Sequence, residues 1–329
     1  MQKINSLLTY FPLTSEQLAA LCAVLPETEI IMRNRENITP EDVTKADVIF
    51  GNVPAHMLKN ANNLKWLHLS SAGTDGYLDL IDRGVLLSNG TGAYNDLIAE
   101  HMLAFTGALC IRLPEYSRQH QQRIWKRGAW AKTICGSTVL VLGCGNIGTA
   151  YAKRMHDLGA YVIGVRRKAC ECPEGVDEML GMEDVDKALP RADIVAMVMP
   201  NTPETVNFMD ARRIALMKDG ALLINCGRGN ALDADALYDA LVSGKLDGAA
   251  IDVAYKEPLP EDDKLWTAPN LIITPHVAGG WIMGGESSPY MAKTVFKVFM
   301  KNLRSYLEDE ELPNIVDPKT GYTRKKNER

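Results

Sequence analysis

Residues 138–148 read Thr-Val-Leu-Val-Leu-Gly-Cys-Gly-Asn-Ile-Gly, an apolar run that leads directly into glycines with the spacing G-x-G-x-x-G. A helical pattern follows from Ile147 to Leu158, so the glycines lie between a predicted strand and a predicted helix. There they permit a tight turn and the close approach of a pyrophosphate, whose charge is stabilised at the helix N-terminus. A turn that only packs helix on strand is the alternative. We predict a dinucleotide site formed by Gly143, Gly145, Asn146, Ile147 and Gly148.

Strand candidates continue outward from this turn. Short apolar runs separated by helix-length patterns match the two mononucleotide-binding halves of a doubly wound parallel sheet, which predicts a Rossmann domain. The six runs are 139–142, 161–165, 194–199, 221–224, 249–253 and 271–273.

The first hundred residues show a second, smaller alternation. It predicts another α/β domain with a parallel sheet. Its strand candidates are 7–10, 29–32, 48–51, 65–69 and 85–87, and its helix candidates are 18–25 and 54–59. A helical pattern over 96–111 and a polar, Arg-rich stretch to Lys132 predict a passage between the domains, and a long helix is expected over 290–307.

Composition excludes several classes of protein. The chain has 329 residues, 46% hydrophobic and 23% charged, which favours a folded protein of more than one domain. The charge balance of 36 − 41 = −5 argues against nucleic acid or an anionic membrane as a partner. No apolar run reaches the ~18 residues of a membrane span. Seven cysteines and an N-terminus unlike a signal peptide predict reduced thiols in the cytoplasm, with no metal site.

Three cations stand at the end of the second predicted strand, about 20 residues past the glycines. An NAD enzyme normally offers Asp or Glu to the ribose hydroxyls there. This chain offers Arg166, Arg167 and Lys168, which suit a 2′-phosphate. We therefore expect NADP as the preferred cofactor and NAD as the alternative, unless the three cations are only a solvated turn.

Three further polar residues each follow a predicted strand. Arg228 lies in Asn225-Cys226-Gly227-Arg228-Gly229, and its fork of donors suits a carboxylate. Glu257 and His276 follow the next two strands. Ligands bind at the carboxyl ends of strands in open α/β sheets, so these residues predict a shared site, although each alone has a structural explanation.

These motifs resemble those of the D-isomer-specific 2-hydroxyacid dehydrogenase family, in family order and over most of the chain. The resembling segments are 71–76, 99–100, 143–148, 199–205, 224–229, 252–260 and 274–276. The resemblance implies a flavodoxin-like substrate domain of residues 1–101 and 285–329 around a Rossmann cofactor domain of residues 102–284. It also implies a homodimer, to which residues 125–130 could contribute.

The resemblance also implies roles for particular residues. His276 would protonate the substrate carbonyl, Glu257 would hold its other nitrogen and favour imidazolium, and Arg228 would bind the substrate carboxylate. Backbone amides near Ala72 and Gly73 would complete the carboxylate site, and Asp252 would face the nicotinamide carboxamide. Pro200, Cys226, Gly227, His276 and Gly279 complete the expected cofactor site. His101 is expected to be structural, and Trp281 either shapes the pocket or packs at the domain edge.

The leading function is an NADPH-dependent reductase of glyoxylate or hydroxypyruvate. Reductases of those acids within the family often use NADPH. One alternative is an NAD-dependent enzyme for a bulkier 2-oxo acid or for phosphoglycerate. Another, from a different class, is a nucleotide-sensing binding protein like the corepressors that resemble this family.

Overall fold

The computed structural model describes residues 2–168, 170–280, 288–318, 321 and 323, and the chain divides into two compact units. Unit 1 comprises Met1–Tyr94 with Gly280–Arg329, and unit 2 comprises Asn95–Gly279. Trp281, which we had expected at the pocket or the domain edge, lies outside the described residues.

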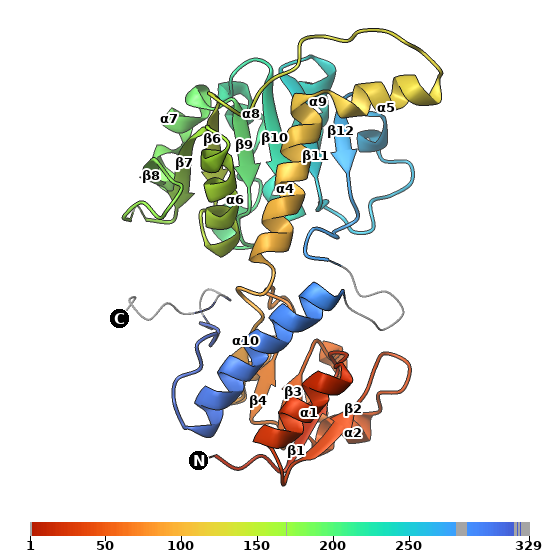
Figure 1. The fold of residues 1–329 in the computed structure, drawn as a ribbon, viewed down its shortest axis with the longest axis vertical. Helices are drawn as coiled ribbons and strands as arrows, with labels where there is room; N and C mark the ends of the chain where they lie inside the picture. The colour runs from red at the N-terminus through yellow and green to blue at the C-terminus, as the bar shows by residue number, and fades with distance from the viewer. Residues whose placement is uncertain (1, 169, 281–287, 319–320, 322, 324–329) are drawn as a thin grey trace. The chain divides into compact units, whose positions relative to one another are not determined.

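Unit 2 is built on a seven-stranded parallel sheet with the order β12-β11-β10-β9-β6-β7-β8 (Figure 1). The strands are β6 (Thr138–Leu142), β7 (Tyr161–Arg166), β8 (Glu178–Gly181), β9 (Ile194–Met197), β10 (Ala221–Asn225), β11 (Leu246–Ile251) and β12 (Leu271–Ile273). The order reverses between β6 and β9, as in a doubly wound nucleotide-binding fold. This confirms the predicted α/β class.

The prediction of six strands in this half was wrong, because β8 was missed. Its sequence Glu-Met-Leu-Gly is short, and its side chains are mostly only half-buried at the edge of the sheet. An edge strand lacks the continuous apolar run that reveals a central parallel strand.

Helices cover both faces of this sheet. They are α4 (Asn95–Cys110), α6 (Asn146–Asp157), α7 (Val185–Ala188), α8 (Ala211–Leu216) and α9 (Ala234–Val242). Helix α5 (Leu113–Gln121) has no buried residues and is not part of these layers. Successive residues of β6 alternate between two cores: Val139 packs with α4 and α6, whereas Leu140 packs with α7, α8 and α9. Figure 1 shows α4 and α6 side by side on one face.

The segment that we had expected to pass between domains belongs to unit 2. All of α4 is included there, because Ala99 and Met102 are fully buried in the core beneath it. The following stretch, including α5, stays in the same unit and is anchored by a hydrogen bond from Lys132 N to Cys110 O of 2.8 Å. The unit boundary therefore falls at Tyr94/Asn95, whereas the sequence led us to place it after residue 101.

Unit 1 contains a five-stranded parallel sheet with the order β2-β1-β3-β4-β5, the flavodoxin-like order. Its strands are β1 (Ser6–Thr9), β2 (Glu29–Met32), β3 (Val48–Phe50), β4 (Trp66–His68) and β5 (Leu86–Ser88). Its helices are α1 (Ser15–Val24), α2 (Pro40–Lys45), α3 (Asp79–Asp82) and α10 (Pro289–Leu307), with the 3₁₀ helix η1 (Ala55–Asn60).

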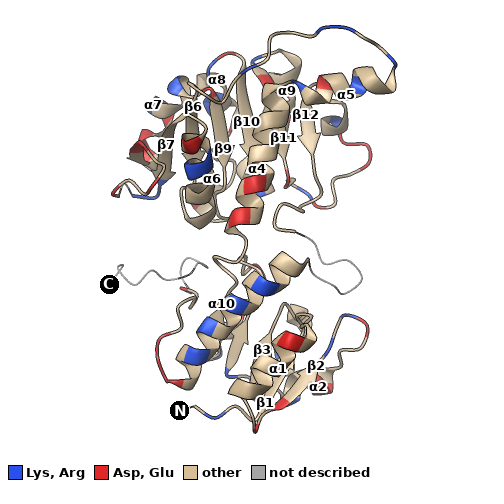
Figure 2. Ribbon diagram, in the orientation of Figure 1, with Lys and Arg blue, Asp and Glu red and all other residues tan. Residues whose placement is uncertain are grey.

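The last helix, α10, returns the chain to the first sheet. Phe299 stacks on Phe50 with ring centroids 4.0 Å apart, so α10 covers one face. Its opposite side is exposed and basic and carries Lys293, Lys297, Lys301 and Arg304. Figure 2 shows basic residues in blue along this helix. The helix is therefore amphipathic, with one apolar face in the core.

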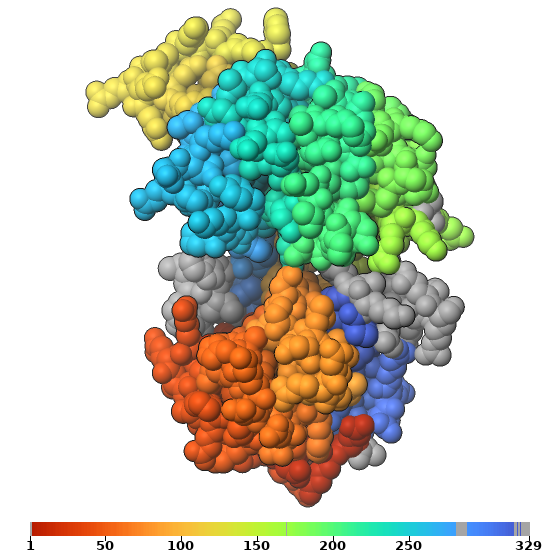
Figure 3. All heavy atoms as spheres, turned by 180° about the vertical axis from the view of Figure 1, so that it is seen from behind, coloured from red at the N-terminus to blue at the C-terminus, as the bar shows by residue number. Residues whose placement is uncertain are grey.

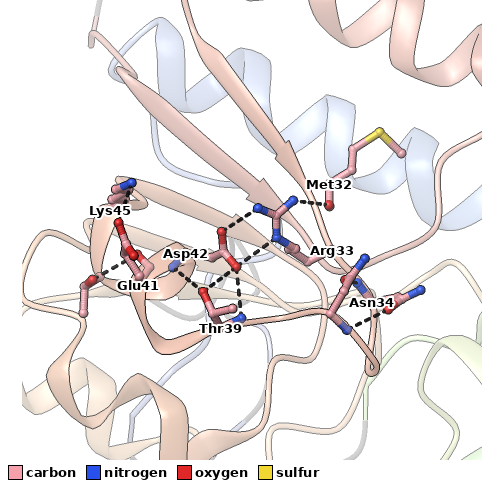
Figure 4. Close-up of polar contacts among 9 residues, drawn as sticks. Met32, Arg33, Asn34, Thr39, Glu41, Asp42 and Lys45 are labelled. Carbon is pink, nitrogen blue, oxygen red and sulfur yellow. Dashed lines mark hydrogen bonds and ion pairs between the residues drawn. The ribbon is translucent and has the colours of Figure 1, made fainter.

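An ion pair closes the loop between β2 and α2 (Figure 4). Arg33 donates to both carboxylate oxygens of Asp42, with Nε and Nη2 at 2.9 and 2.8 Å. Thr39 caps α2 and also donates to Asp42 from its amide and its hydroxyl. Burial alone would raise the pKa of Asp42, but these hydrogen bonds outweigh it and leave that pKa lowered.

A buried histidine lies in the aromatic core of unit 1. His68 ends β4 with no exposed surface, and its Nδ1 lies 2.7 Å from the hydroxyl of Ser88, which also accepts from Trp66 Nε1. Its Nε2 has no hydrogen-bond partner within the described part of the chain. Burial lowers the pKa of His68 from 6.5 to about 3.

We expect this histidine to make unit 1 acid-sensitive. The unfolded chain takes up the proton below pH 6.5 and the folded chain only near pH 3, so stability is lost as pH falls through that window. Between pH 7 and pH 5 the loss attributable to His68 is about 2 kcal/mol. Urea unfolding of the unmodified chain and of His68→Phe at both pH values measures it. An equal change with pH in the two proteins would exclude His68 as the cause.

Among the described residues, no single helix is long and apolar enough to cross a membrane. Only α4 and α5 taken together, with a bend of 68° between them, reach that length and composition.

Candidate functional site

The glycine-rich turn joins β6 to α6 in a conformation that requires glycine at two positions. Gly143 has φ +95°, and a Cβ there would lie 2.7 Å from Val198 O. A Cβ on Gly148 would lie 2.4 Å from Gly143 O. Gly145, which precedes α6, faces open space and offers no side-chain cap. The first amides of α6, those of Asn146 and Ile147, therefore point toward a position where a phosphate could bind.

Arg166 ends β7 and lies against this turn. Its Nε donates to the carbonyl of Cys144, and its Nη1 lies 3.3 Å from the thiol of Cys170. Arg167 and Lys168 follow and are exposed. The predicted cationic group thus stands beside the glycine turn, where the adenosine end of a dinucleotide would lie in this fold.

The loops after β9 and β10 lie next to each other at the carboxyl edge of the unit 2 sheet. A Cβ on Gly227 would lie 2.7 Å from Met199 O, so the two loops touch. Cys226 is buried, which raises the pKa of its thiol, and Asp252 raises it further. Pro200 accepts a hydrogen bond from the hydroxyl of Thr205. At the cofactor positions predicted here, Pro200, Cys226 and Gly227, a bound cofactor would contact backbone peptide groups rather than reactive side chains.

Arg228 follows β10 at the same edge. Its backbone is held by Asn225, whose Nδ2 donates to Arg228 O at 3.0 Å, and its Nη1 donates to Gly227 O at 2.9 Å. Gly229 lets the chain pass the next loop, since a Cβ there would lie 1.9 Å from Ala254 O. The guanidinium is half-buried, which suits recognition of an anion.

Glu257 and His276 form a pair after β11 and β12. His276 Nδ1 lies 2.8 Å from Glu257 Oε2, and Glu257 Oε1 accepts from the amide of Ala254 at 3.0 Å. A carboxylate only accepts, so Nδ1 carries the proton. Nε2 has no hydrogen-bond partner among the described residues, and the side chain is 51% exposed. The pair can thus present an acid or base at Nε2.

Asp252 holds the loop that carries His276. Its carboxylate accepts from the amides of Val277 and Ala278 at 2.9 Å and from the hydroxyl of Thr274, and its carbonyl accepts from His276 N at 2.7 Å. These bonds hold His276 at φ +55°, a conformation that costs energy for a residue with a side chain. Gly279 follows in the same loop. The buried Asp252 therefore holds the loop of His276 in place.

His101 of α4 lies near Asp252, with its Nε2 3.9 Å from Asp252 Oδ1. Its Nε2 is 3.3 Å from the hydroxyl of Thr274, and its ring meets Phe105 edge-on. The contact with Thr274 joins α4 to the loop, whereas Phe105 lies on α4 itself.

In unit 1, the segment of Ala72 and Gly73 follows β4. Asn89 Nδ2 donates to Ala72 O at 2.8 Å. The amides of Ala72 and Gly73 donate to no group among the described residues, and both residues are half-buried. They are two adjacent donors of the kind that binds anions.

Sequence reasoning missed Asn52 and Asn89, the side chains that hold this segment. Asn52 Oδ1 accepts from Ser70 N at 2.9 Å. The available signal was their position, since they stand one or two residues after β3 and β5, at the same edge as the segment after β4.

Among the described residues, no group of three or more His, Cys, Asp or Glu could hold a metal.

Comparison with known proteins places these features in a family. Residues 103–278 match the family described as D-isomer specific 2-hydroxyacid dehydrogenase, NAD binding domain. Glyoxylate/hydroxypyruvate reductase B of Pectobacterium carotovorum is 31% identical over 82% of this chain and 83% of its own.

Two solved structures share the fold over nearly the whole chain. A D-isomer specific 2-hydroxyacid dehydrogenase family protein of Aeromonas salmonicida superposes with a TM-score of 0.83 at 32% identity, over 95% of this chain and 99% of that one. A D-isomer specific 2-hydroxyacid dehydrogenase of Xanthobacter autotrophicus, in complex with NADPH and MES, gives 0.80 at 27% identity, over 97% and 100%.

Proposed function

Because this chain belongs to the D-isomer-specific 2-hydroxyacid dehydrogenase family, we propose that it reduces a small 2-oxo acid with NADPH, with glyoxylate and hydroxypyruvate as preferred substrates. Members of this family are oxidoreductases that bind NAD or NADP and act on small hydroxy or oxo acids, and this protein is one of them. The observation that carries the proposal is the Glu257–His276 pair, at 2.8 Å, after β11 and β12, with Arg228 after the neighbouring strand β10 at the same carboxyl edge of the unit 2 sheet.

In this proposal each of the site residues has one role. Arg228 binds the substrate carboxylate and orients the carbonyl carbon. His276 donates the proton on Nε2 to the carbonyl oxygen, while Glu257 stabilises the positive charge of the ring. Asp252 keeps the acid in place and lies near the position proposed for the nicotinamide carboxamide. Ala72 and Gly73 add amide donors for the carboxylate.

The residues at the glycine turn suit a bound dinucleotide cofactor. The glycine turn leaves room for a pyrophosphate at the N-terminus of α6, formed by Gly143, Gly145, Asn146, Ile147 and Gly148. Bound NADPH supplies the hydride. Support for NADP over NAD comes from the three cations after β7 and from the Xanthobacter relative, whose structure contains NADPH.

The proposal extends to the domain that binds the substrate, the oligomeric state and the cellular location. We assign the amide donors for the substrate to unit 1, the split domain expected over 1–101 with 285–329, which comprises Met1–Tyr94 with Gly280–Arg329. The exposed side chains of Trp125 and Trp130, on the segment that projects from unit 2 in Figure 3, support a homodimer formed by a second copy. The seven free cysteines, at positions 22, 110, 135, 144, 170, 172 and 226, support a reducing, cytoplasmic location.

A panel of 2-oxo acids assayed with NADPH and with NADH tests the function. We expect turnover of glyoxylate and hydroxypyruvate with NADPH. Preference for a bulkier acid with NADH would favour the NAD-dependent alternative. Cofactor binding without turnover of any acid would favour a nucleotide-sensing protein.

A further inference from the structure

We propose that Asn52 is a positioning residue for the anion site of unit 1. It holds the segment Ser70–Gly73 so that the amides of Ala72 and Gly73 stay available to a carboxylate. The inference deepens the proposed function and rests on it for the identity of the anion, a 2-oxo acid.

The side chain of Asn52 uses both of its polar atoms on this segment. Oδ1 accepts from Ser70 N at 2.9 Å, from Ser70 Oγ at 2.8 Å and from Ser71 N at 3.2 Å. Nδ2 donates to Ser71 Oγ at 2.8 Å, and the Ser71 hydroxyl in turn donates to Gly73 O at 2.8 Å. One side chain thus binds Ser70 and Ser71 directly and reaches Gly73 through the Ser71 hydroxyl.

The carbonyl groups of the segment are bound, which sets the direction of its amides. Ser71 O accepts from Gly90 N and Ala72 O accepts from Asn89 Nδ2, both at 2.8 Å. In a planar trans peptide the N–H points opposite to the C=O, so the amides of Ala72 and Gly73 turn away from these partners. They donate to no other group among the described residues. A pair of oriented, unused donors remains.

An asparagine suits this position better than an aspartate. Ser71 accepts a hydrogen bond from Asn52 Nδ2, which directs its own proton to Gly73 O. A carboxylate has no donor, so the Ser71 hydroxyl would turn toward it and release Gly73 O. A carboxylate would also place a negative charge beside an anion site.

Two variants test this role against a merely structural one. Asn52→Ala removes all four hydrogen bonds, whereas Asn52→Asp keeps the three accepted by Oδ1. With saturating NADPH, we expect KM for hydroxypyruvate to rise in both by a factor on the order of 10 to 100, the effect of losing one charge-assisted hydrogen bond. The KM for NADPH should stay unchanged. Asn52→Asp should keep a Tm near that of the unmodified protein and still have a KM at least as high as Asn52→Ala.

The matched control is Asn63→Ala, an exposed asparagine of unit 1 that donates to Thr44 O at 2.9 Å. It should leave both KM values unchanged. If KM instead follows Tm, so that Asn52→Asp restores it, Asn52 is only structural and the inference fails. Should Asn52→Ala not fold, the comparison of Asn52→Asp with the unmodified protein decides alone.

Binding of oxalate to the full chain, measured by calorimetry with NADPH present, separates this inference from the proposed function. We expect the Kd for oxalate to rise in Asn52→Asp by the same factor as KM. An unchanged Kd would overturn the role of Asn52 even while the enzyme turns over. A raised Kd in a protein that reduces no 2-oxo acid would support the anion site and refute the reductase.

Discussion

Replacing His276 with alanine is expected to lower kcat for 2-oxo acid reduction by ~10²–10⁴, the effect of losing a positioned acid. His276 Nε2 faces away from Glu257 and is the imidazole nitrogen left for a substrate. Cofactor affinity should be nearly unchanged, because the glycine turn and Arg166 are separate from this loop. Steady-state rates and NADPH titration measure both quantities.

A control for loss of structure is His156→Ala, an exposed histidine of α6 whose partner is Asp177. It should keep full kcat. If His276→Ala retained more than about a tenth of kcat with its affinity for NADPH intact, another group would be the acid.

Arg166→Asp is expected to reverse much of the preference for NADPH over NADH. A 2′-phosphate carries nearly two negative charges at pH 7, and two partly exposed contacts of ~1 kcal/mol each favour NADPH by a factor of roughly 30 in kcat/KM. The substitution also removes the bond from Arg166 Nε to Cys144 O, so the ratio of the two cofactors is the quantity to compare. The ratio should also shrink with added salt.

Lys187→Asp is the matched control, since Lys187 is an exposed cation of α7 that pairs with Asp184. It changes net charge equally and should leave the ratio unchanged. Better turnover with NADH in the unmodified protein would reduce the cations after β7 to a solvated turn.

The sequence predicted most of the fold, because buried parallel strands carry continuous apolar runs. The run that became β12 matched the observed strand residue for residue, and Ile147 to Leu158 differed from α6 by one residue at each end. The short helix α2 escaped notice, because its six residues are stabilised by Thr39 and by the Arg33–Asp42 pair rather than by an apolar stripe. Such contacts become visible only once the chain has folded.

The sequence predicted the site residues that lie in the loops after predicted strands. Glu257 and His276 stand 19 residues apart in sequence, and the hydrogen bond between them depends on how the β11 and β12 loops turn. The task of Asp252 could not be read from its position, because its carboxylate binds amides of a loop more than 20 residues away. The position of Asn52 after β3 was a signal, but its role was not predictable, because it binds the amides of Ser70 and Ser71 and the direction of those amides depends on the fold.

The most direct test of the account uses the unmodified protein with hydroxypyruvate and NADPH. Oxidation of the reduced nicotinamide is followed by its absorbance, and the chirality of the glycerate product is determined. One NADPH is expected to be oxidised for each D-glycerate formed. Failure to oxidise NADPH, or formation of the L-isomer, would contradict it.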